Sequence, residues 1–235
     1  KRSRSHDYVS REVINVRENV GLIEVANFSK HEFKGTDARK FLDHVMAGKL
    51  PKPGRISLSP MLSYRGKLCG DLTVACFDEN EFMVFGSGAA QEMHRRWFES
   101  HLDKFDVNYK NRSDEFHGIS IAGPNSRKVL EKIVRDDVSN EKFKFRDSRR
   151  MFVGGVPAII NRISFTGELG YEIYVAPHYQ IKLYEELMEA GKEFNIKPFG
   201  GRALMSMRLE KNWGAWTLDY RPDFTAKETG LDMFI

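Results

Sequence analysis

The segment from Phe165 to Glu172, with the alternating run to Val175 behind it, constrains the fold of this chain more than any other stretch. Gly167 and Gly170 predict a tight turn, because glycine adopts a positive φ at low cost. After the turn, alternate residues predict a β-strand whose faces differ in character. One face holds Tyr171, Ile173 and Val175, and the other holds Glu172 and Tyr174.

Glu172 is a carboxylate in the middle of this predicted strand. Removing a carboxylate from water costs several kcal/mol or more unless the group is paired or hydrogen-bonded. Glu172 therefore either bonds a specific partner or lies at the wet rim of a sheet, and the motif alone leaves both readings open.

Composition limits the classes of protein that fit. The 235 residues are 41% hydrophobic and 30% charged, with a net charge of +4, which is typical of a globular protein and argues only weakly for anionic ligands. We expect neither a membrane span nor a nucleic-acid partner. Cys69 and Cys76 are seven residues apart in one predicted strand, so they point to opposite faces and should not pair. No histidine has the spacing of a metal ligand, so we predict no metal.

The order of predicted elements indicates an α+β protein with antiparallel sheets and flanking helices. Residues 1–10 are predicted to be a polar lead-in, and Thr36 to cap a helix. A hairpin is predicted over 55–77, and a helix near 88–101 should turn Ala90, Met93, Trp97 and Phe98 inward. The loop 86–88 before that helix could cradle a phosphate, but it lacks the lysine of a P-loop and reads better as a plain helix start.

Two further charged residues stand out. Asp71 is a carboxylate in the middle of the return strand, where β-propensity disfavours it, and an exposed position on a wet sheet face would also explain it. Arg202 opens the last predicted helix, where a cation opposes the helix dipole. Arg202 therefore either has a specific use or forms a salt bridge.

Five stretches in this order resemble the folate-binding aminomethyltransferase (glycine cleavage T-protein) family. The resemblance is greatest to the copy fused behind the flavin domain of dimethylglycine and sarcosine dehydrogenases. The stretches are residues 21–54, PMLSYRGKLCGDLTV (60–74), GISIAGPNSRKVL (118–130), ISFTGELGYEIYV (163–175) and MRLEKNWGAW (207–216) with the later TGL (229–231).

The resemblance implies the T-protein-like fold, in which a second sheet-and-helix lobe is inserted into a folate-binding body. The body would be residues 1–57 and 147–235, and the lobe 58–146. The C-terminal barrel and the N-terminal flavin domain of the family are expected to lie outside this chain, in which no Gly-x-Gly-x-x-Gly fingerprint is present.

The resemblance also implies roles for individual residues. Asp71 matches the family's catalytic aspartate beside the reactive folate nitrogens, and Glu172 matches the glutamate that holds the pterin. Arg202 matches an arginine that contacts folate, and Phe28 matches an apolar contact. Phe165 stands where the family usually has tyrosine. A carboxylate can accept the adjacent amino and ring N–H groups of a pterin together, which suits Glu172.

The resemblance thus implies tetrahydrofolate-dependent transfer of a one-carbon unit from a methylated amine. FAD would belong to the flavin domain. Two alternatives remain: a non-catalytic folate-fold binding or assembly protein, and a folate-dependent demethylase of another donor. We expect a soluble protein of the mitochondrial matrix or a bacterial cytoplasm.

Overall fold

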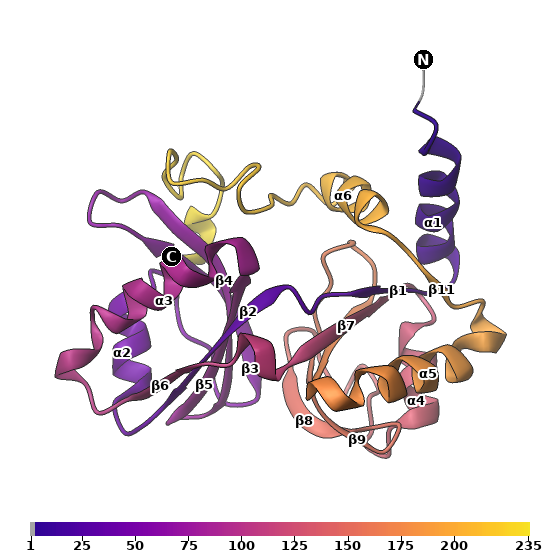
Figure 1. The fold of residues 1–235 in the computed structure, drawn as a ribbon, viewed down its shortest axis with the longest axis horizontal. Coiled ribbons are helices and arrows are strands. Elements are labelled where there is room, and N and C mark those ends of the chain that lie inside the picture. The colour runs from indigo at the N-terminus through magenta and orange to yellow at the C-terminus, as the bar shows by residue number, and fades with distance from the viewer. Residues whose placement is uncertain (1–2) are drawn as a thin grey trace. The chain divides into compact units, whose positions relative to one another are not determined.

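The computed structural model describes residues 3–235, and the chain divides into two compact units (Figure 1). Unit 1 contains the residues up to Ala26 and Glu115–Trp213. Unit 2 contains Asn27–Asp114 and Gly214–Ile235. Each unit is therefore built from two separate stretches of the chain.

Unit 1 is organised on one sheet whose strand order is β11-β1-β7-β10-β9-β8 within the described residues. The strands are β1 (Gly21–Glu24), β7 (His117–Ala122), β8 (Ser148–Val153), β9 (Val156–Asn161), β10 (Gly170–Val175) and β11 (Lys197–Pro198). The helices are α1 (His6–Glu18), α4 (Ser126–Ile133), α5 (Gln180–Gly191) and α6 (Gly201–Glu210), with 3₁₀ turns at Pro177–Tyr179 and Lys192–Phe194. Pairing is antiparallel except between β1 and β11.

The two faces of this sheet carry different cores because strand residues alternate between faces. On one face, Ile121 and Ile173 belong to a large apolar cluster with Leu130 of α4 and Leu187 of α5. On the other face, Ala122 packs with residues of α1 and α6. β10 therefore turns its apolar residues to α4 and α5, and leaves Glu172 on the face that carries α1 and α6.

Unit 2 is organised on a sheet with the strand order β3-β4-β5-β2-β6 within the described residues. The strands are β2 (Phe28–Lys34), β3 (Arg55–Leu62), β4 (Leu68–Asp78), β5 (Glu81–Ser87) and β6 (Asn108–Asn111). The helices are α2 (Ala38–Val45) and α3 (Gln91–Glu99), with 3₁₀ turns at Gly88–Ala90, Leu102–Lys104, Ser113–Glu115 and Asp232–Phe234. Phe33, Leu72 and Phe98 meet in the apolar core of this unit.

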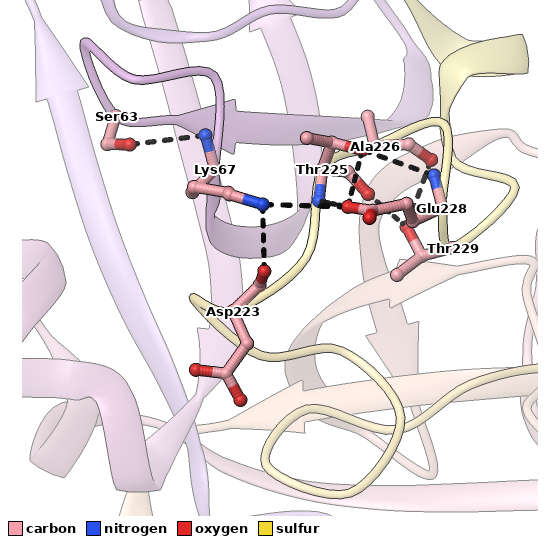
Figure 2. A network of polar contacts seen from close by, with 7 residues as sticks. All are labelled: Ser63, Lys67, Asp223, Thr225, Ala226, Glu228 and Thr229. Atoms are coloured by element: carbon pink, nitrogen blue, oxygen red, sulfur yellow. Dashed lines mark hydrogen bonds and ion pairs between the residues drawn. The ribbon is translucent and has the colours of Figure 1, made fainter.

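Hydrogen bonds and an ion pair join the C-terminal segment to the start of β4 (Figure 2). Nζ of Lys67 donates to the carbonyl oxygen of Asp223 at 2.9 Å and lies 3.6 Å from the carboxylate of Glu228. The backbone N–H of Leu68 donates to the carbonyl of Phe224 at 2.9 Å. These bonds hold the hairpin from which the strand carrying Asp71 begins.

The α+β class with antiparallel sheets and flanking helices is confirmed, but the units do not divide at the boundaries expected for a lobe at 58–146. β2 belongs to unit 2 because it pairs with β5 and β6. β7 belongs to unit 1 because it pairs with β1 and β10. The body expected at 1–57 and 147–235 is likewise divided, since its last residues, from Gly214, belong to unit 2.

Three local expectations were wrong. The predicted polar lead-in forms most of the first turns of α1, whose Val9, Val13 and Val16 pack against α6; residues 1–2 of that stretch lie outside the described residues. Helix α2 begins one residue later than expected, with Asp37 at its N-cap, and Thr36 instead donates to Asp106. On α3, Met93 is 39% exposed, and the inward position is taken by His94. None of the helices within residues 3–235 is both long and apolar enough to cross a membrane.

Candidate functional site

Glu172 lies in the middle of β10, partly buried, and has a specific partner. The hydroxyl of Tyr174, two residues along the same face, donates to Oε2 of Glu172 at 2.8 Å. Burial raises the pKa of the Glu172 carboxyl to about 7, although the Tyr174 bond and the charge of Lys211 both act to lower it. The expectation of a specific partner therefore describes Glu172 better than that of a freely solvated strand residue.

The loop before β10 contains the glycine turn that the sequence predicts. Gly167 has φ +87°, a conformation that favours glycine, so the predicted turn is present. Gly170 instead opens the strand, and a Cβ there would lie 2.7 Å from the side chain of Ser164. The buried hydroxyls of Ser164 and Thr166 bond each other at 2.7 Å, which fixes the backbone around the partly buried Phe165.

Two cations contact this loop: Arg17 pairs with Glu168 at 2.5 Å, and Lys211 lies on the side of Ser164. Nζ of Lys211 donates to the carbonyl oxygen of Ser164 at 2.8 Å, and the Lys211 stem passes Gly167. Burial lowers the pKa of the Lys211 ammonium, while the charge of Glu172 raises it. Lys211 therefore supplies the positive charge that Glu172 feels across the loop.

Arg202 lies at the start of α6, whereas Lys211 caps the end of that helix. The guanidinium of Arg202 is exposed and donates to Oγ of Ser5 at 2.6 Å, at the start of α1. Nine residues of helical rise separate it from Lys211, which is about 13 Å along the axis. The structure thus brings Lys211, and not Arg202, to the pterin-binding glutamate predicted from sequence.

Asp71 lies on β4 of unit 2, partly buried. Burial raises the pKa of the Asp71 carboxyl to about 7, although a hydrogen bond from its own backbone N–H acts to lower it. An exposed aspartate on a wet face would keep its ordinary pKa. The Asp71 carboxyl is therefore more desolvated than a wet-face aspartate would be, and it can exchange a proton near neutral pH.

Phe28 and Asp71 lie on the same face of the unit 2 sheet, at the same end of its strands. Phe28 opens β2 opposite Ser87 of β5, while Thr73 of β4 lies opposite Phe85. Continuing that register by two residues brings Asp71 opposite Ser87. One strand thus separates Phe28 from Asp71, a spacing of about 10 Å.

One polar group beside Glu172 escaped the sequence analysis. Asn161 of β9 is paired in register with Glu172 and is fully buried. Its Oδ1 accepts from Ser148 at 2.7 Å, but its Nδ2 has no hydrogen-bond partner among residues 3–235. A buried amide without a partner is rare and costly, so it is a candidate donor for a ligand.

The residues present fit a pterin. Oε2 of Glu172 has one bond from Tyr174, and a carboxylate can accept several more. Asn161 adds a donor, and Phe165 adds partly buried aromatic surface within the same unit. Tyr174 could have been predicted from its place two residues beyond Glu172, whereas Lys211 and Asn161 reach Glu172 only through the tertiary fold.

The fold matches that of a solved aminomethyltransferase. The glycine cleavage system aminomethyltransferase T from Bartonella henselae superposes with a TM-score of 0.83, at 23% identity, covering 93% of this chain and 58% of that one. The heterotetrameric sarcosine oxidase from Corynebacterium sp. U-96 gives a TM-score of 0.61 at 18% identity, covering 83% of this chain and 96% of that one. These likenesses define the class of fold: a two-unit, T-protein-like α+β protein.

Sequence relatives agree. Human dimethylglycine dehydrogenase is 36% identical over 238 residues, which is 100% of this chain and 27% of that protein. Aminomethyltransferase of Thermoanaerobacter pseudethanolicus is 28% identical over 223 residues, which is 94% of this chain and 60% of that protein. The chain thus spans about a quarter of the length of its dehydrogenase relatives.

The model of the GCVT N-terminal domain family matches residues 1–235. The chain therefore belongs to the GCVT N-terminal domain family. The family expected from the sequence motifs is thereby confirmed.

Proposed function

We propose that this chain binds tetrahydrofolate and directs a one-carbon unit from a methylated amine onto it. The observation that carries the proposal is Glu172, a partly buried strand carboxylate with a raised pKa, held by Tyr174 in the loop-and-strand motif of the family. When bound, tetrahydrofolate would supply the nucleophilic nitrogens that take up the one-carbon unit.

We assign the binding of the pterin to Glu172, with Phe165 as an aromatic contact in the same unit. The apolar contact that the sequence motif implies for Phe28, in unit 2, stays a prediction. The carboxylate of Glu172 would accept the paired N–H groups of the pterin. Arg202, exposed at the start of α6, is suited to the anionic tail of folate. Its position supports this role better than a contact with the pterin ring.

We assign the catalytic role to Asp71. An incoming aminomethyl or iminium group develops positive charge, which a fixed carboxylate stabilises. A carboxyl with a pKa of about 7 can also accept or return a proton at neutral pH. Phe28, at the same end of the strands in this sheet, would shield this carboxyl from water.

The donor is proposed from the relatives. Dimethylglycine and sarcosine appear in the names of relatives that share 36% identity with this chain. We therefore propose a flavin domain with bound FAD as the partner that oxidises such an amine. The mitochondrial relatives support a place in the mitochondrial matrix, and the bacterial relatives support a bacterial cytoplasm.

The test joins this chain to a flavin domain that oxidises dimethylglycine. With tetrahydrofolate present, the one-carbon product should appear as methylenetetrahydrofolate, and little free formaldehyde should form. Asp71→Asn should shift the product toward free formaldehyde while amine oxidation continues. Equal product ratios in the wild type and Asp71→Asn would contradict the catalytic role, and no effect of tetrahydrofolate at all would favour the non-catalytic alternative.

A further inference from the structure

A β-bulge lies two residues before Asp71. In the register of β3 and β4, Met61 is opposite Gly70 and Leu62 is opposite Leu68, so Cys69 has no counterpart on β3. The pairing of β4 with β5 is registered from Thr73 onward. A bulge re-aims the residues around it, and its extra residue is left outside the ladder.

His94 of α3 satisfies the backbone of that bulged residue. Its Nε2 lies 3.0 Å from the carbonyl oxygen of Cys69. Because a carbonyl accepts, Nε2 must carry the proton, and the ring is the Nε2–H tautomer. His94 is 1% exposed, so this bond is made away from water.

Two glycines make room for the imidazole. A Cβ on Gly70 of β4 would lie 2.8 Å from Nε2 of His94, and a Cβ on Gly86 of β5 would lie 3.1 Å from Nδ1. The Cβ on Gly70 would force a shift of the ring or the strand, whereas the Cβ on Gly86 would clash first with Leu72 and only crowd the ring. The backbone thus lacks side chains at the two places where His94 presses against the sheet.

The ring is also suited to a fixed, neutral role. Burial lowers the pKa of His94 to about 4, so the imidazole is neutral at physiological pH. Its Nδ1 is buried with no hydrogen-bond partner in the part of the chain that the structure describes. A buried histidine that leaves one nitrogen unbonded is costly, and its bond to the bulge is the contact that explains its orientation.

We propose that His94 is a positioning residue for Asp71: by bonding the carbonyl of Cys69, it locks the bulge that aims the Asp71 carboxyl. The inference rests on the proposed catalytic role of Asp71. His94 itself lies on the α3 side of the sheet, whereas alternation puts Asp71 on the opposite face. It acts through the backbone of β4 and does not touch the substrate.

The first test reads the tautomer and needs no activity. In ¹H–¹⁵N spectra of the wild-type chain at pH 7, His94 should carry its proton on Nε2. An Nδ1–H tautomer would overturn the proposal, because Nε2 could then not donate to Cys69.

The second test reads the Asp71 carboxyl by ¹³C titration. His94→Leu removes the donor at similar volume, so β4 should loosen and the pKa of Asp71 should fall by about one pH unit toward its ordinary value. His94→Gln keeps an N–H donor and should preserve most of the wild-type pKa, and His44→Leu, at an exposed position of α2, should preserve it fully. An unchanged Asp71 titration in His94→Leu would overturn the proposal.

The third test separates this inference from the proposed function. His94→Leu should lower one-carbon capture about tenfold, with the Kd for tetrahydrofolate changed less than about twofold. If Asp71→Asn leaves capture unchanged, the catalytic assignment fails, while the tautomer and titration still decide the role of His94 in the bulge. If His94→Leu does not fold, the Asp71 titration of His94→Gln and the tautomer of His94 in the wild type decide between the outcomes.

Discussion

The hydroxyl of Tyr174 donates to Oε2 of Glu172 at 2.8 Å along one face of β10. The ring of Tyr174 lies across β7, where Gly118 leaves space: a Cβ on Gly118 would be 2.7 Å from Cε1 of Tyr174. The phenol is fully buried, and burial raises its pKa well above the ordinary value, so it remains a donor at neutral pH. Glu172 is thus oriented by its own strand before any ligand arrives.

Tyr174→Phe should weaken folate binding in a pH-dependent way. The lost hydrogen bond favours the ionised carboxylate, so its removal raises the pKa of Glu172 above about 7. At pH 7, more of the carboxyl is then neutral, and affinity should fall about fivefold, which corresponds to about 1 kcal/mol. At pH 9 the difference should shrink. Titration of tetrahydrofolate at both pH values checks this, with Tyr184→Phe on the exposed face of α5 as control; a loss that is equal at both pH values would count against it.

Lys211→Met and Arg202→Met should separate the roles of the cation that caps the end of α6 and the cation at its start. Lys211 lies beside the loop before β10 that we propose contacts the pterin, whereas Arg202 lies at the far end of the helix. Lys211→Met should therefore weaken binding of both tetrahydrofolate and a tail-less tetrahydropterin by a few-fold. Arg202→Met should weaken only tetrahydrofolate. Equal effects of Arg202→Met on both ligands would instead support the contact with the pterin that the sequence motif implies.

Asp71→Asn should stabilise the protein at alkaline pH. The pKa of Asp71 is raised from 3.8 to about 7 in the folded state, so the native state binds more protons than the unfolded state between those values. The wild type therefore loses stability as pH rises from about 4 to about 7, and the loss is complete above pH 7. Asparagine removes the cost, which we put at about 1–2 kcal/mol after discounting for partial exposure.

Denaturant unfolding at pH 5 and pH 8 checks this sign. Asp71→Asn should exceed the wild type by more at pH 8 than at pH 5, while Asp103→Asn, at an exposed position of unit 2, should show no such trend. A destabilised Asp71→Asn at pH 8 would mean that the aspartate is held by bonds that favour its charged form.

Features that depend on residues close together in the sequence, such as strand faces and turns, could be predicted from the sequence. The alternation around Glu172 fixed the face of β10, and the turn at Gly167 needed a left-handed residue. The boundaries of the units were not predictable in this way, because the partner of β2 is β5, some fifty residues later in the chain. His94 was missed for a related reason: the helical pattern turned its neighbour Met93 inward, and the bulge whose carbonyl His94 bonds forms only in the tertiary fold.

The most direct measurement is calorimetric titration of this chain with tetrahydrofolate, comparing the wild type with Glu172→Gln. Glutamine keeps the size and can still accept from Tyr174, but it presents an N–H group to the donors of the pterin. We predict that the wild type binds and that Glu172→Gln binds about 30- to 100-fold more weakly, or about 2–3 kcal/mol, while Glu185→Gln on α5 binds as the wild type does. Equal affinities of the wild type and Glu172→Gln, or no binding by the wild type, would contradict the folate assignment.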